Sequence, residues 1–437
     1  MKKRMISLLC MGALVAGMFS GCAEREEDTP KGEKVSVSEQ GETSNEILYA
    51  ENLTDGLDTQ ICIDYAIKSY EPVQNFAYEL FEQNMDEDNP VLSPVSAYLA
   101  LGMAGTGAKG ATLSEFQQVL GTDLDCIPHS LMTTLPRDRE GMKISLANSA
   151  WVDDDFEAEK DYLVEIDSFY LSDVYRANLS ANQTMEDMNA WIDTNTNGLI
   201  PKLLEEPLDE DSRLALFNTI YFKGKWAIEF SKDDTRERDF HKEDGTITQV
   251  DMMHLYGEKL QYVSTKDAVG VVLPYKDETM AFVALMPAPA GNQTVREMYE
   301  NMEWSDICEI LKQEKRTLCN LQLPKFEVEF AKKLNESLNT MGLCKAFDGS
   351  QADLSGMGKS KDGNNIFIDL VFQKAVVIVD EEGTEAAAVT EVVVDCESCI
   401  IEEPPVEIFF NEPFLYMIVD KEKEIPLFVG IMDNPKQ

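Results

Sequence analysis

The spacing of apolar residues divides the chain into short helices and short strands. After Tyr70, five apolar residues recur at intervals of three and four and predict a first helix with one buried face. These residues are Val73, Phe76, Ala77, Leu80 and Phe81. The chain before them lacks such a pattern, so we expect ordered structure to begin near Tyr70.

Two further helices are predicted from their starting residues. Ser93-Pro94 resembles a helix start, because a serine hydroxyl caps free amides and proline suits the first turn. The small apolar residues that follow predict a deeply buried helix. Thr112 and Glu115 have the spacing of a capping box and predict a third helix that ends at Gly121.

Seven β-prone runs are bounded by turns or charges. They are residues 214–222, 271–273, 281–286, 366–368, 375–379, 414–419 and 427–431. Helical and strand runs are mixed without a regular βαβ alternation, and no linker interrupts residues 60–435. We therefore expect one large α+β domain with several sheets, over residues 59–437.

The N-terminus has the layout of an exported protein. Residues 1–21 combine a basic start with an apolar stretch, which predicts a signal peptide. Cys22 follows small residues in a pattern that resembles the lipobox of bacterial lipoproteins, although Phe19 stands where leucine is usual. We expect lipidation at Cys22; the alternative is an ordinary signal peptide with an incidental cysteine. Residues 22–58 are polar and acidic and predict a disordered tether.

Charge and histidine content exclude several classes of function. The 437 residues contain 38 Lys and Arg against 80 Asp and Glu, a formal charge of −42, which repels nucleic acid and anionic lipid surfaces. None of the histidines, at 129, 241 and 254, lies in a catalytic or zinc-binding motif. We expect no enzyme activity, no metal, no cofactor and no nucleic-acid partner, with membrane attachment through lipid alone.

An unusual two-faced segment follows Glu381. From Thr384 to Val394, alternate side chains on one face are small and then apolar, and none is charged, whereas the other face carries Glu385 and Glu391. Such a segment could enter the middle of a sheet with its first face buried. The alternative is an ordinary permanent strand. Residues 396–405 after it have the composition of an exposed loop.

Residues 381–388, Glu-Glu-Gly-Thr-Glu-Ala-Ala-Ala, resemble the hinge of the serpin family. Five other segments resemble serpin motifs and occur in the expected order. They are residues 89–96, 216–226, 273–275, 323–326 and 410–414. The resemblance covers about residues 65–435.

This resemblance implies a serpin fold with three β-sheets, eight or nine helices and an exposed reactive-centre loop. It also implies inhibition of extracellular serine proteases, with cysteine proteases as a second target class, by suicide loop insertion and covalent acyl-enzyme trapping. The alternative is a non-inhibitory binding or scaffold protein. We expect a monomeric lipoprotein on the extracellular face of a bacterial cell, or a secreted form. The implied hinge residues are Glu381, Gly383, Thr384, Glu385, Ala386, Ala387 and Ala388.

The resemblance also places residues where the main sheet opens, at sites called the shutter and the breach. These are Ser93, Ser96, Asn218, Trp226 and Gln373. Serpins usually have a histidine where Gln373 stands. Glutamine can hydrogen-bond with Ser93 or Asn218 but cannot become charged, so we predict a shutter without histidine-linked pH dependence.

The loop is a few residues longer before Pro404 than in many relatives, so its scissile bond has alternatives. Counting from the hinge gives Glu397-Ser398, which we favour and which suggests a Glu-preferring protease; counting back from Phe414 gives a bond near Glu402. A cut after Asp395 is a third alternative. Cys396 and Cys399 flank the favoured bond and could form a loop disulfide, or could be two reduced cysteines.

Overall fold

The computed structural model describes residues 51–52, 69–289, 293–313, 315–384 and 404–436. Its contacts group residues 48–437 into one compact unit. The signal peptide, Cys22, most of the tether and residues 385–403 of the loop lie outside the described part. The predictions made for those residues therefore stay predictions.

An eight-stranded sheet, here called the main sheet, positions the hinge. Its order is β1-β6-β4-β7-β16-β15-β13, and β3 pairs with β4 at one end. β1 pairs with β6 although its two residues fall within the segment predicted to be a tether. The strands are β1 (Glu51–Asn52), β3 (Arg137–Arg139), β4 (Met142–Asp153), β6 (Ser172–Ala177), β7 (Leu214–Lys225), β13 (Phe326–Lys333), β15 (Phe372–Val379) and β16 (Gly383–Thr384).

A nine-stranded sheet has the order β17-β12-β9-β10-β11-β18-β19-β2, and β8 pairs with β9. The 18-residue β9 joins its two halves, because residues 252–260 pair with β12 and residues 261–264 pair with β10. The strands are β2 (Val91–Leu92), β8 (Arg236–His241), β9 (Ile247–Ser264), β10 (Ala268–Pro274), β11 (Met280–Pro287), β12 (Thr317–Pro324), β17 (Val406–Phe409), β18 (Phe414–Asp420) and β19 (Ile425–Met432). A third sheet pairs β5 (Phe156–Ala158) with β14 (Gly358–Ser360).

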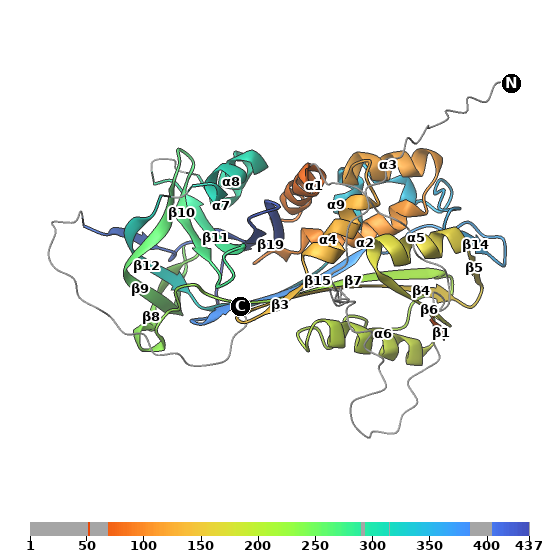
Figure 1. The fold of residues 1–437 in the computed structure, drawn as a ribbon, viewed down its shortest axis with the longest axis horizontal. Coiled ribbons are helices and arrows are strands. Elements are labelled where there is room, and N and C mark those ends of the chain that lie inside the picture. Colours follow the sequence, from red (N-terminus) through yellow and green to blue (C-terminus); the bar gives the residue numbers. More distant parts are fainter. Residues whose placement is uncertain (1–50, 53–68, 290–292, 314, 385–403, 437) are drawn as a thin grey trace, which may run out of the picture. The chain divides into compact units, whose positions relative to one another are not determined.

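Helices cover both faces of the main sheet (Figure 1): α2 and α5 lie on one face and α6 on the other. The described residues form nine α-helices and two short 3-10 helices, η1 (Lys232–Asp234) and η2 (Lys345–Phe347). The α-helices are α1 (Glu71–Glu82), α2 (Pro94–Thr106), α3 (Gly110–Leu120), α4 (Cys126–Thr134), α5 (Lys160–Tyr170), α6 (Asn182–Asn195), α7 (Val295–Glu300), α8 (Trp304–Leu311) and α9 (Asn335–Thr340). The α+β architecture with three sheets and nine helices confirms the predicted fold.

The first three helices lie where the apolar spacing placed them, but their predicted caps are wrong. The five apolar residues predicted for the first helix are all buried in α1. The Ser93 side chain makes no capping bond, because it is buried in the core before α2. Thr112 accepts a bond from the backbone of Asp353, and Glu115 binds the segment around Lys345. Contacts distant in sequence therefore replace the predicted capping box.

Six of the seven predicted strands are present, in β7, β10, β11, β15, β18 and β19. The seventh, residues 366–368, is wrong, because this segment is irregular and forms no ladder. Ile368 instead donates one backbone hydrogen bond to Ala346, and the segment lines the cavity described below.

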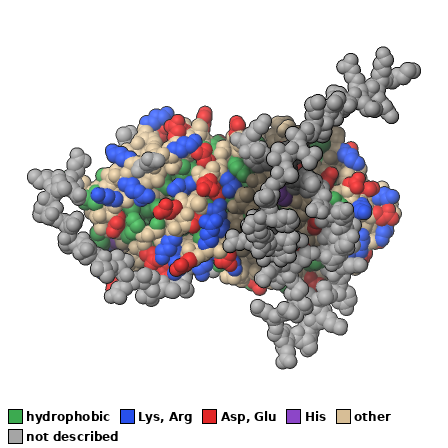
Figure 2. Space-filling model, viewed as in Figure 1, with side chains coloured by type: hydrophobic (Ala, Val, Ile, Leu, Met, Phe, Trp, Pro, Cys, Tyr) green, Lys and Arg blue, Asp and Glu red, His purple; other side chains and the backbone are tan. Residues whose placement is uncertain are grey.

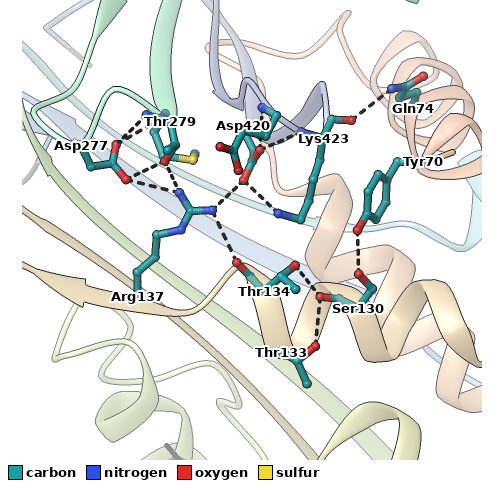
Figure 3. Close-up of polar contacts among 12 residues, drawn as sticks. Tyr70, Gln74, Ser130, Thr133, Thr134, Arg137, Asp277, Thr279, Asp420 and Lys423 are labelled. Carbon is teal, nitrogen blue, oxygen red and sulfur yellow. Dashed lines mark hydrogen bonds and ion pairs between the residues drawn. The ribbon is translucent and has the colours of Figure 1, made fainter. Parts of the chain in front are cut away.

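A buried polar network fastens β3 to turns of the nine-stranded sheet (Figure 3). The guanidinium of Arg137 donates to Asp420 at 2.9 Å and to Asp277 at 3.3 Å, and it also contacts Thr279. Lys423 lies 3.4 Å from the same Asp420 carboxylate, which is fully buried. Arg137 thus joins the end of the main sheet to the turns after β10 and β18.

The surface is not uniformly acidic. On the face visible in Figure 2, basic side chains are interspersed with acidic ones despite the net charge of −42. No helix among the described residues combines the length and apolar character that a membrane crossing needs.

Candidate functional site

A tight turn after β15 reverses the chain, which then re-enters the main sheet. The Asp380 carboxylate accepts hydrogen bonds from the backbone N–H groups of Glu382, at 2.9 Å, and Gly383, at 3.2 Å. The backbone N–H of Asp380 donates to the carbonyl of Gly383. Gly383 and Thr384 then form β16, which lies between β7 and β15 and is antiparallel to both.

Both residues of β16 fit closely. A Cβ atom on Gly383 would lie 2.0 Å from the carbonyl oxygen of Gly224, so only glycine is accommodated here. The Thr384 side chain is 3% exposed, and its hydroxyl lies 2.7 Å from the hydroxyl of Tyr275. Burial raises the pKa of Tyr275 above its ordinary value, so its hydroxyl remains protonated. The structure therefore places Thr384 on the buried face of the main sheet.

Trp226, directly after β7, holds the turn in place. Its indole N–H donates to the carbonyl of Asp380 and its backbone N–H to the carbonyl of Glu382, both at 2.9 Å. The ring stacks on Tyr275 with centroids 4.9 Å apart and planes 9° apart. Trp226 thus connects the end of β7 to the turn between β15 and β16.

Two glutamates of the turn are buried and paired with lysines. Glu381 accepts bonds from Lys325, at 3.0 Å, and from the hydroxyl of Thr235, at 2.8 Å. Glu382 pairs with Lys232 at 2.6 Å. Burial alone would raise the pKa of Glu381, but the hydrogen bonds from Lys325, the backbone and Thr235 bring that pKa below its ordinary value.

Beyond β16 the main sheet is open. Among the described residues, β7 pairs with β4 and β15 pairs with β13, but β7 and β15 pair with each other nowhere. A cavity of about 1460 Å³ lies there, lined by residues 214–220 of β7 and 372–376 of β15. We call this gap the slot. Its two edges are rows of backbone groups without a partner strand, which is the arrangement that accepts an added strand.

Four of the predicted shutter residues line the slot: Ser93, Ser96, Asn218 and Gln373. The Gln373 amide exchanges two hydrogen bonds with the backbone of Ser93, accepting at 3.0 Å and donating at 2.8 Å. Ser96 lies 3.5 Å from the carbonyl of Asn218. The Asn218 amide donates to the side chain of Asn148 at 2.8 Å. Ser93 is one of the two partners expected for Gln373. The glutamine side chain bonds to the backbone of Ser93 and not to its hydroxyl.

Comparisons with known proteins match this geometry to one family. The family described as "Serpin (serine protease inhibitor)" matches residues 71–435. The chain belongs to the serpin family. Serpins are generally protease inhibitors and not enzymes.

Relatives and solved structures agree with this assignment. An uncharacterized serpin-like protein of Thermococcus kodakarensis is 31% identical over 83% of this chain and 85% of its own length. Human serpin B4 is 31% identical over 82% of this chain and 97% of its own. The thermophilic serpin tengpin in its native state is 32% identical with a TM-score of 0.80, covering 89% of this chain and 100% of that one. Tengpin in its latent state gives 0.73.

Replacing Gln373 by methionine tests the serpin shutter. Gln373→Met keeps the side-chain volume but leaves the buried N–H of Ser93 without a partner and leaves its carbonyl with only the N–H of Ala97, so we expect a loss of about 2 kcal/mol in unfolding free energy. Guanidinium unfolding of the uncleaved protein measures it. Ser96→Ala is the control, because a 3.5 Å bond contributes little. Equal effects of the two substitutions would contradict this role for Gln373.

Acid should weaken the Glu381 contacts. A carboxyl whose pKa is lowered on folding contributes stability above its unfolded pKa of about 4.3, and this is lost as the pH falls through the folded pKa. At pH 7 we expect Glu381→Gln to lower the unfolding free energy by about 1 kcal/mol. At pH 3.5 the difference from the unchanged protein should be smaller, because this stability is lost as the pH falls through the lowered pKa of Glu381. Thermal unfolding at both pH values measures it.

The variant must be compared with the parent protein at each pH, because acid has the opposite effect on stability at the neighbouring Asp380. Burial raises the pKa of Asp380, so acid relieves an unfavourable charge there. Glu329→Gln, which removes an exposed pair with Lys374, is the matched control. A difference that persists unchanged at pH 3.5 would show that the charge of Glu381 is not what stabilises the turn.

Several residues of this site were not singled out from the sequence. Tyr275 and Lys325 lie inside serpin-like motifs, so a signal for them was present. Lys232 and Thr235 follow no motif, and only the fold brings them to Glu381 and Glu382. The hinge residues Glu385, Ala386, Ala387 and Ala388, the Glu397-Ser398 bond, and Cys396 and Cys399 lie outside the described residues.

Proposed function

We propose that this serpin inhibits extracellular proteases by inserting its cleaved reactive-centre loop into the slot of the main sheet. One observation carries the proposal: β16 already occupies the first two positions between β7 and β15, and the slot continues beyond it. A chain segment that continued β16 would satisfy the unpaired edges of both strands.

The register of β16 predicts which loop residues would pair. Thr384 lies opposite Gly224 in β7 and Val379 in β15. In an antiparallel ladder each later loop residue meets an earlier strand residue, so Leu214, the first residue of β7, would face Val394. The strand formed would have the small, uncharged side chains of Ala386, Ala388 and Thr390 on the buried face, where charged side chains would be costly.

This register supports the scissile bond Glu397-Ser398. The last loop residue that β7 can pair is Val394, so three residues remain to reach Glu397, whereas a bond near Glu402 would leave eight. In the proposed reaction the serine hydroxyl of the protease attacks the carbonyl of Glu397. The amine of Ser398 leaves with a proton, and Glu397 stays joined to the protease as an ester. Insertion then distorts the protease before water can cleave that ester.

The proposed target is a serine protease that prefers glutamate, with a cysteine protease as a second class. We further propose that the protein is exported, lipidated at Cys22 and displayed as a monomer on the outside of a bacterial cell. The signal-like residues 1–21 and the acidic residues 22–58 support this location. A disulfide between Cys396 and Cys399 would bridge the scissile bond and hold the two cleaved ends together, so full insertion and release of the C-terminal fragment require these two cysteines to be reduced.

The test incubates the purified protein with a panel of serine and cysteine proteases that includes a Glu-specific enzyme. We expect a complex that survives boiling in denaturing gels, and a released C-terminal fragment that begins at Ser398 by mass spectrometry. If every protease cleaves the loop and stays active, the inhibitory function is wrong. A non-inhibitory binding or scaffold role would then take its place.

A further inference from the structure

Three lysines gather on the face of the main sheet that is turned away from α2, beside β16. Lys143 in β4 lies directly opposite Lys223 in β7, and Lys225 follows two residues later on the same face. Their sequence neighbours Met142, Ile144, Phe222, Gly224 and Trp226 are buried on the other face. We call these three side chains the lysine face.

The three lysines of the lysine face form no ion pairs within the described part of the chain. Like charges directly opposite each other destabilise a sheet. No described carboxylate forms an ion pair with any of the three lysines, although the chain holds 80 Asp and Glu residues against 38 Lys and Arg. Asp138 in β3 is opposite Lys143 in register and lies on the far side from β7. Lys143 otherwise lies 5.9 Å from the ring of Tyr221. Lys223 and Lys225 therefore lie beside β16 with no ion-pair partner among the described residues.

The register brings the loop to this face at one particular position. Gly383 is opposite Lys225 and Thr384 is opposite Gly224, with the Thr384 side chain buried. Side chains alternate between the faces of a sheet. The position after Thr384 would therefore point to the lysine face, opposite Lys223, and the residue in that position of the sequence is Glu385.

The other edge of the slot offers Glu385 no positive charge at this level. Its partner in β15 would be Ile378, and the residue beyond Ile378, in β13, is Glu327. A glutamate between Ile378 and an uncharged residue of β7 would be repelled by Glu327. Lys223 and Lys225 supply the opposite charge from the β7 side.

We propose that the lysine face is the docking surface for Glu385, so that Lys223 and Lys225 draw the first residue beyond Thr384 into the slot and speed the start of insertion. This inference rests on the proposed loop insertion. It goes further than loop insertion because it assigns the start of insertion to an attraction between Glu385 and two lysines that lie outside the hinge.

A charge-swap cycle tests the proposal. The loop of each purified variant is cut with a non-target protease, and insertion is followed by stopped-flow tryptophan fluorescence. We expect Lys223→Glu and Glu385→Lys each to slow insertion by about tenfold, and the double exchange to recover to within about threefold of the unchanged protein. In 1 M salt these differences should shrink, because screening weakens the attraction. Lys332→Gln, on β13 of the same sheet, is the control and should leave the rate unchanged.

The outcomes separate this inference from the function on which it rests. Guanidinium unfolding of the cut protein shows whether insertion has occurred. If the cut chain becomes more stable but every variant inserts its loop at the same rate as the unchanged protein, only the electrostatic step is overturned. If added phosphate speeds insertion and Glu385→Gln has no effect, the three lysines bind a free anion instead of Glu385. This result would also overturn the electrostatic step. A cut chain that gains no stability overturns loop insertion itself.

Discussion

Thr384→Arg is expected to convert the protein from an inhibitor into a cleaved substrate. The Thr384 side chain is buried between β7 and β15 with its hydroxyl 2.7 Å from that of Tyr275. An arginine there would place a guanidinium, which stays charged, in the buried space beside Tyr275 that now holds a small threonine. Insertion would stall at its first step while cleavage of the loop continued. We expect the yield of boiling-resistant complex to fall by about a hundredfold.

The matched control for this substitution is Thr384→Val. Valine keeps the branched shape and loses one hydrogen bond to Tyr275, which contributes about 1 kcal/mol. Its complex yield should stay within about fivefold of the unchanged protein. Both variants are incubated with the same protease and compared by denaturing gels. An arginine variant that traps protease as well as the parent would show that residue 384 does not need to enter the sheet.

Arg137→Met should cause the largest loss of stability, about 3 to 5 kcal/mol in unfolding free energy. The substitution keeps much of the apolar stem but removes the guanidinium that contacts Asp277 and Asp420. Asp420 is fully buried, so its charge would keep only Lys423, at 3.4 Å, and backbone N–H groups as partners. An incompletely paired carboxylate in that position opposes folding.

Arg139→Met is the control for this prediction, because Arg139 lies in the same strand, is exposed, and has no ion pair among the described residues. Guanidinium unfolding of the uncleaved protein measures both variants. We expect the control to change the unfolding free energy by less than about 0.5 kcal/mol. A loss below about 1 kcal/mol in Arg137→Met would mean that the network of Figure 3 contributes little to stability.

Local patterns predicted the local parts of this molecule. The apolar spacing of α1 depends only on residues within one helix, and it identified all five of its buried residues. The alternating faces around Thr384 likewise follow from the geometry of a strand, and the burial of Thr384 agrees with them. The serpin-like motifs span the chain in order and include Trp226, which bonds to the turn after β15.

The failures share one cause, which is that a distant segment took the place of a local partner. Glu115 was expected to cap its own helix, but it binds the backbone near Lys345, 230 residues away in sequence. Arg137 carried no signal at all, because its partners Asp277 and Asp420 lie 140 and 283 residues further along. Such contacts are consequences of the topology and leave no periodic trace in a single sequence.

The open edge of β7 also has a consequence for hydrogen exchange. In an antiparallel strand, successive backbone N–H groups point to opposite neighbours, so every second amide of β7 bonds to β4 while the others face the slot. Deuterium should therefore enter β7 with a period of two residues, quickly at the amides that face the slot and slowly at those bonded to β4. Once a strand fills the slot, that alternation should disappear, and β7 would exchange as the centre of a closed sheet.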